Sequence, residues 1–92
     1  MKINLNEVRK AAAPLEGRLE TLHRKKAFDL KIEPYGFIYT PVSSGTPERQ
    51  DWKFVERVIE RFNELNSFYP SDYKDITHAA SYLLVIIRSM TK

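Results

Sequence analysis

The sequence predicts a small α+β domain with the element order helix, strand, strand, helix, helix and a β-hairpin packed against the helices. Two observations indicate this class: three segments repeat their apolar residues with the period of a helix, and one segment between them alternates with the period of a strand. A length of 92 residues suits one domain, so 1–92 is predicted to be a single unit.

The first helix is expected to begin at Asn4, because Glu7 follows three residues later in the pattern of a capping box. A proline inside a helix costs about 3 kcal/mol, so Pro14 either kinks this helix or ends it. The apolar residues keep their phase across Pro14, which predicts one kinked helix to about Lys26. These residues are Leu5, Val8, Ala12, Leu15, Leu19 and Leu22.

A β-hairpin is predicted after this helix. Residues 28–33 alternate apolar and charged side chains, as a half-buried strand does. "EPYG" at 33–36 is good turn chemistry, with Pro34 preset for the first central position and Gly36 free to adopt a positive φ. "FIYT" at 37–40 then predicts the returning strand.

Two further helices complete the predicted fold. Thr46 is the expected N-cap of the second helix and Pro47 its first residue, with an apolar face that continues to about Asn66. Asp75 is the expected N-cap of the third helix, whose apolar side extends to Met90.

Composition limits the classes of function. The chain has no cysteine, so neither a disulfide nor a thiolate metal site is expected, and no metal or cofactor is predicted. The start of the chain lacks the apolar run of a signal peptide, and the longest apolar run, 82–87, is far shorter than the roughly 20 residues of a membrane span. We expect a cytoplasmic protein with no membrane contact. Because a domain this small buries a thin core, a homodimer is expected.

The charge is unevenly distributed along the chain. The net charge is +3; residues 1–31 carry eight Lys or Arg against four Asp or Glu, whereas residues 32–92 carry seven against eight. The densest cationic cluster is Arg24, Lys25 and Lys26. It could contact nucleic-acid phosphates next to the aromatic residues of the hairpin, or simply complement the dipole at the end of a helix.

The loop formed by Ser43, Ser44 and Gly45 is a second candidate anion site. Small residues before a helix N-terminus let an oxyanion approach free N–H groups, and Arg49 and Lys53 follow in the expected first turns. The glycine spacing and lysine of a Walker loop are absent, and helix capping alone explains the same residue types. Further along this helix, glutamates three residues from each cation indicate a solvated face.

Catalysis is not predicted. His78 and Tyr82 are one helical turn apart, but His23 is the only other histidine, and no nucleophile elbow or metalloprotease spacing occurs. A polar helix face explains this pair, so the protein is expected not to be an enzyme.

Apolar residues supply a second function hypothesis. The connector and last helix carry residues expected to be uncovered, which would mark a protein interface: Phe68, Tyr69, Tyr73 and Val85. The Leu5–Leu22 stripe could equally fill the chain's own core. The leading hypothesis is a non-enzymatic module, homodimeric, that binds nucleic acid or another polyanion; the alternative is a protein–protein adaptor or assembly subunit.

Overall fold

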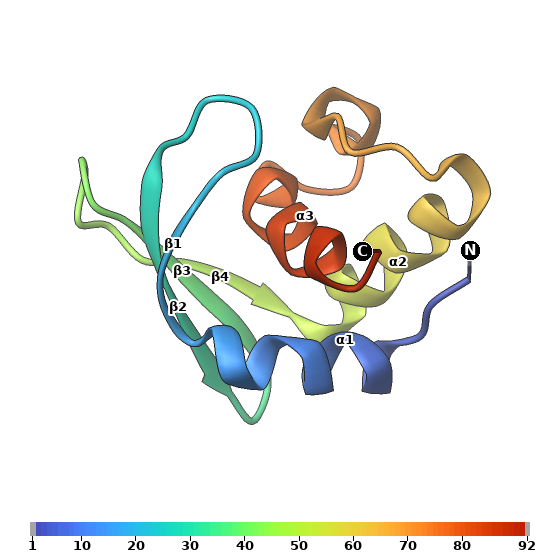
Figure 1. The fold of residues 1–92 in the computed structure, drawn as a ribbon, viewed down its shortest axis with the longest axis horizontal. Helices are drawn as coiled ribbons and strands as arrows, with labels where there is room; N and C mark the ends of the chain where they lie inside the picture. Colours follow the sequence, from blue (N-terminus) through green and yellow to red (C-terminus); the bar gives the residue numbers. More distant parts are fainter. Residues whose placement is uncertain (1, 92) are drawn as a thin grey trace.

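The computed structural model describes residues 2–91 and contains a four-stranded antiparallel sheet with helices packed against one face (Figure 1). The strands lie in the order β1-β2-β3-β4 across the sheet. This architecture confirms the predicted α+β class. The elements in chain order are α1 (Leu5–Ala12), the 3₁₀ turn η1 (Ala13–Leu15), β1 (Gly17–Glu20), β2 (Ala27–Glu33), β3 (Gly36–Pro41), β4 (Glu48–Asp51), α2 (Trp52–Leu65), the 3₁₀ turn η2 (Pro70–Tyr73) and α3 (Ala80–Ser89).

The predicted hairpin is confirmed as β2 and β3, which pair from Phe28 opposite Pro41 to Glu33 opposite Gly36. Gly36 does not have the predicted positive φ; the glycines with a positive φ are Gly17 and Gly45. Gly36 is required for another reason. A Cβ atom on Gly36 would overlap the backbone of the adjacent strand β4. The glycine therefore allows close approach of two strands.

The predicted kinked helix is wrong beyond Ala12. The capping box forms as expected, with Asn4 Oδ1 accepting from the Glu7 amide at 2.9 Å. However, Pro14 lies in η1, and Gly17 has a φ of 120°, which is incompatible with a helix. The chain then forms β1, in which Leu19 lies opposite Phe28. Leu19 and Leu22 continue the spacing of a helix in the sequence, but Leu19 lies in β1 and Leu22 in the loop that follows it.

The predicted start of the second helix is also wrong. The residues after Pro47 form β4, in which Gln50 pairs with Phe37. Gln50 is buried and Arg49 exposed, as the alternation of a strand requires. Helix α2 begins at Trp52 and is capped by Asp51, whose side chain accepts from the amide of Phe54.

The third helix is shorter than expected. It begins at Ala80, and Asp75 lies before it and caps nothing. The Asp75 carboxylate instead accepts two hydrogen bonds from the Arg61 guanidinium of α2, at 3.0 and 2.8 Å. This bidentate pair ties the α2–α3 connector to α2. The guanidinium hydrogen bonds also lower the pKa of Asp75 below its ordinary value.

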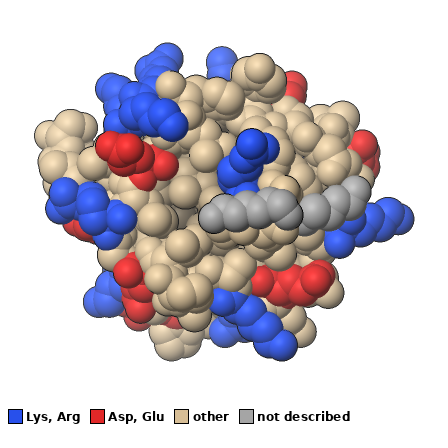
Figure 2. All heavy atoms as spheres, in the orientation of Figure 1, with Lys and Arg blue, Asp and Glu red and all other residues tan. Residues whose placement is uncertain are grey.

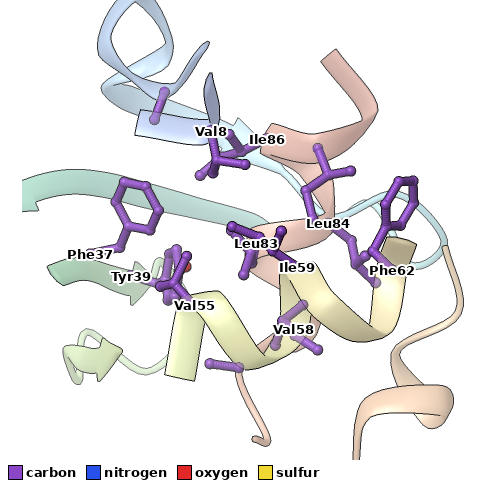
Figure 3. Packing of buried hydrophobic residues seen from close by; sticks show 14 of the residues in the cluster. Val8, Phe37, Tyr39, Val55, Val58, Ile59, Phe62, Leu83, Leu84 and Ile86 are labelled. Carbon is purple, nitrogen blue, oxygen red and sulfur yellow. The ribbon is translucent and has the colours of Figure 1, made fainter. Parts of the chain in front are cut away.

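The core lies between the inner face of the sheet and the three helices (Figure 3). The Leu5–Leu22 stripe belongs to this core: Val8 and Ala12 are buried, and its leucines pack partly buried against the cluster. In Figure 3 side chains from α1, α2 and α3 meet those of β3; the labelled residues are Val8, Phe37, Tyr39, Val55, Val58, Ile59, Phe62, Leu83, Leu84 and Ile86.

One polar network crosses the core. The buried Tyr39 hydroxyl donates to Gln50 Oε1 at 2.6 Å, and Gln50 Nε2 donates to Thr77 Oγ1 at 3.3 Å. Burial raises the pKa of Tyr39 well above its ordinary value, so the phenol remains a donor. The network joins two strands to the segment that leads into α3.

Within residues 2–91, no helix is both long enough and apolar enough to cross a membrane.

Candidate functional site

A groove of about 800 Å³ lies where four segments of the chain meet. Residues of four segments line it: the β1–β2 loop at 21–26, the β3–β4 turn at 42–47, the α2–α3 connector and α3. The volume is in the range of roughly 300–1,000 Å³ that is typical of small-molecule sites. The groove joins three features that the sequence presented separately: the basic cluster, the serine loop and the aromatic connector.

Three cations line the groove, and all are exposed. Arg24 and Lys26 come from the β1–β2 loop, and Lys74 comes from the α2–α3 connector. The loop closes through the Thr21 side chain, whose Oγ1 accepts from the Lys26 amide at 3.0 Å. Lys25 is exposed with a φ of 55° and does not line the groove. The predicted cluster therefore contributes two of its three cations, and it lies in a strand connection instead of at a helix end.

Hydroxyl groups form a second part of the lining. Ser43 and Ser44 enter from the β3–β4 turn, and Ser71 and Ser81 from the far wall. The expected helix N-terminus behind Ser43–Gly45 is absent, because these residues form a turn between strands. Gly45 provides this turn with a φ of 68° and donates its N–H to the Pro41 carbonyl at 2.8 Å.

An aromatic stack stands at the rim. Tyr69 is 63% exposed, and its ring lies parallel to the His23 imidazole, with centroids 4.9 Å apart and an interplanar angle of 5°. The Phe68 carbonyl oxygen accepts a hydrogen bond from His23 Nε2 at 2.9 Å. This contact holds the imidazole against Tyr69, and the stack presents an aromatic surface to solvent.

One carboxylate lines the groove. Glu48 is half-buried, and its Oε2 accepts from the Tyr82 hydroxyl at 3.1 Å. The Tyr82 ring packs against Phe28 and Tyr39, with centroids at 4.8 and 5.1 Å. Burial, and then the charge of Glu48, raise the pKa of Tyr82, so its hydroxyl stays protonated near neutral pH.

Two predicted cations lie outside the groove. Arg49 is on the opposite face of the sheet from Gln50, with its guanidinium over the Tyr35 ring at 5.7 Å. Lys53 is exposed on α2 beside Glu56. On the face drawn in Figure 2, positive and negative side chains are interspersed and form no large area of one sign.

The predicted interface residues are also divided. Tyr73 is fully buried, and its hydroxyl donates to the Ser67 carbonyl at 2.8 Å, so the prediction that it is uncovered is wrong. Val85 packs partly buried against the core. Phe68 lies edge-on to Phe62 at 5.2 Å and borders the groove, as does Tyr69.

Sequence reasoning missed several groove residues. Lys74, Glu48 and Tyr82 have no local pattern that connects them, because they come from the α2–α3 connector, β4 and α3 and meet only in the folded chain. His78 is exposed and precedes α3, so it does not share a helix with Tyr82 as expected. Within residues 2–91, no group of three or more histidine, aspartate or glutamate side chains could hold a metal ion.

None of the protein-family models, curated proteins or solved structures compared with the chain matches it. The site is therefore interpreted from its own geometry.

Proposed function

We propose that the protein is a non-enzymatic binding module that holds single-stranded nucleic acid in the groove. The observation that carries the proposal is the meeting of three cations, four serine hydroxyls and an exposed aromatic stack in one concavity. Single strands offer matching groups, because their phosphates attract cations, their backbone oxygens accept from hydroxyls and their bases stack on aromatic rings.

The charges of the lining favour an anionic backbone. Arg24, Lys26 and Lys74 stand against one carboxylate, Glu48, which leaves a net charge of +2. On α2, by contrast, the cations Lys53 and Arg57 alternate with Glu56 and Glu60. The groove therefore attracts phosphate more strongly than the α2 surface does.

The aromatic stack favours a single strand over a duplex. The Tyr69 ring is stacked on one face, and its exposure leaves surface for a base. Bases in a duplex are stacked on each other and offer no free face, whereas an unpaired base adds about 1–3 kcal/mol by stacking on an aromatic side chain.

The test is fluorescence anisotropy of a short labelled single strand of mixed sequence, titrated with protein at several salt concentrations. Each phosphate contact contributes about −0.7 to the slope of log K against log salt, so three contacts predict a slope of about −2. We expect the triple variant Arg24→Ala/Lys26→Ala/Lys74→Ala to lose most of this slope. Tyr69→Ala should weaken binding by about 5- to 150-fold with little change in slope.

The matched control is Arg49→Ala/Lys53→Ala/Arg57→Ala, which removes the same charge outside the groove. Equal weakening by both triple variants would show that net charge alone drives binding. Absence of binding at low salt would refute the proposal.

The adaptor alternative retains Tyr69, which is 63% exposed, and the groove-lining Phe68. The adaptor hypothesis predicts binding to a partner protein. The affinity of this binding should not depend on salt concentration and should be lost in Tyr69→Ala. The expected homodimer remains a separate prediction, and light scattering tests it against the chain mass of 10.8 kDa.

A further inference from the structure

Glu48 is the one acidic side chain in the lining of a groove that otherwise carries cations and hydroxyls. It is the first residue of β4 and lies opposite Tyr39, on the same face of the sheet as the buried Gln50. This register turns its carboxylate toward α3, where Tyr82 donates to it. Among residues 2–91, no cation lies within ion-pair distance of this carboxylate.

A carboxylate in the groove repels the phosphates of a nucleic acid. The part of the ligand that contacts Glu48 must therefore be something other than the sugar-phosphate backbone. An ionised carboxylate only accepts hydrogen bonds, and its two oxygens have about four acceptor sites. Tyr82 uses one of these sites. Both oxygens therefore remain able to accept from a ligand that presents two neighbouring donors.

In single-stranded nucleic acid, two neighbouring donors occur on the Watson–Crick edge of guanine, as N1–H and N2–H₂. Cytosine, adenine and thymine or uracil each place an acceptor beside the donor on that edge, which would face the carboxylate unfavourably. We propose that Glu48, held by Tyr82, selects guanine among the bases that enter the groove. This inference rests on the proposed function and specifies the ligand of that site.

Tyr82 acts as a positioning residue in this proposal. Its ring packs against Phe28 and Tyr39, and its hydroxyl donates to one oxygen of Glu48 at 3.1 Å. A carboxylate fixed in this way loses less side-chain entropy when a base binds.

The experiment is competition by deoxynucleoside monophosphates for a labelled oligothymidine strand bound to the intact protein. All competitors carry the same phosphate, so differences report the base alone, and the deoxy sugar removes the 2′-hydroxyl as an alternative donor. A bidentate base contact discriminates by about 5- to 150-fold, so dGMP should compete at least about fivefold better than TMP. Deoxyinosine monophosphate keeps N1–H and lacks the N2 amino group, so it should fall between them.

Two variants separate recognition by Glu48 from general stacking. Glu48→Gln removes a negative charge and replaces one acceptor by a donor, so dGMP should bind more weakly while TMP binds equally or more tightly. Tyr82→Phe keeps the ring and should reduce the preference for dGMP without changing TMP competition. Glu60→Gln on the exposed surface of α2 is the matched control and should change neither.

The outcomes distinguish the two proposals. If the labelled strand binds and all monophosphates compete equally, guanine selection is wrong and the proposed function stands. The same conclusion follows if Glu48→Gln leaves the dGMP preference intact. If the labelled strand does not bind at low salt, the proposed function and this inference both fail.

Discussion

The buried pair of Tyr39 and Gln50 allows a quantitative test of the core. Both side chains are almost fully inaccessible, at 0% and 2% exposure, and the Tyr39 hydroxyl donates to Gln50 Oε1 at 2.6 Å. In Gln50→Leu the volume is kept, but the hydroxyl loses its partner in a place that water does not reach. A buried polar group left without a partner costs about 1–3 kcal/mol, and we expect the free energy of unfolding to fall by this amount.

Tyr39→Phe tests the other half of the bond. It leaves Gln50 Oε1 unpaired and should also cost about 1–3 kcal/mol. The double variant Tyr39→Phe/Gln50→Leu removes both partners, so its loss should be well below the sum of the two single losses, with a coupling of about 1–3 kcal/mol. The Thr77 hydroxyl, which Gln50 also contacts, keeps its bond from the Ala79 amide at 3.0 Å in every variant.

The assay is equilibrium unfolding in urea, followed by circular dichroism and by the fluorescence of Trp52, the one tryptophan of the chain. Coincident transitions by the two probes would justify a two-state treatment. Additivity of the single losses within about 0.5 kcal/mol would refute the reasoning, because independent residues behave in that way.

Three other perturbations test contacts that hold the fold. Gly36→Ala should lower the free energy of unfolding by about 1–3 kcal/mol in urea unfolding, because the new Cβ would meet the backbone of Gln50; no loss would contradict this close approach. The lowered pKa of Asp75 means that its pair with Arg61 stabilises the fold above about pH 4, the ordinary range of an unfolded aspartate, and that this contribution disappears as the pH falls through the lowered pKa. Asp75→Asn should therefore flatten the loss of stability measured in acid, and an unchanged acid profile would contradict the pair's role. Burial raises the pKa of Tyr73 from 10.0 to about 12, so the unfolded chain releases this proton first and stability should fall as the pH rises from about 10 to about 12. Tyr73→Phe should make that alkaline decline shallower, and a decline of unchanged steepness would exclude Tyr73 as its source.

The hairpin shows what local signals can predict. Alternation in 28–33, the Pro34 turn and the returning strand are neighbours in the chain, and the structure pairs them as expected. The capping box of Asn4 and Glu7 likewise depends on two residues three positions apart. In such cases the physical cause of the structure lies within a few residues, so it is readable from the sequence.

The two outer strands show where local signals fail. β1 and β4 have four residues each, and they obtain their hydrogen bonds from β2 and β3 respectively. Neither GRLE nor ERQD has the β-branched or aromatic residues that favour a strand by themselves. Each of these segments is extended because it pairs with a neighbouring strand. This pairing forms only when the chain folds, so the local sequence does not predict it.

The candidate site divides in the same way. The sequence predicted that Arg24 and Lys26 contact an anionic ligand and that Tyr69 belongs to a protein interface, but it placed the cations at a helix end. Only the tertiary structure shows that these residues line one groove with Lys74 and Glu48. It also shows that Tyr73 is buried.

The sequence by itself determined the α+β class, the central hairpin and the first helix cap, because periodicity and turn chemistry act over a few residues. The four-stranded sheet, the groove and the position of the Glu48 carboxylate in it were decided by the tertiary structure alone. These features depend on backbone hydrogen bonds and packing between segments far apart in the chain, and no local pattern encodes such contacts.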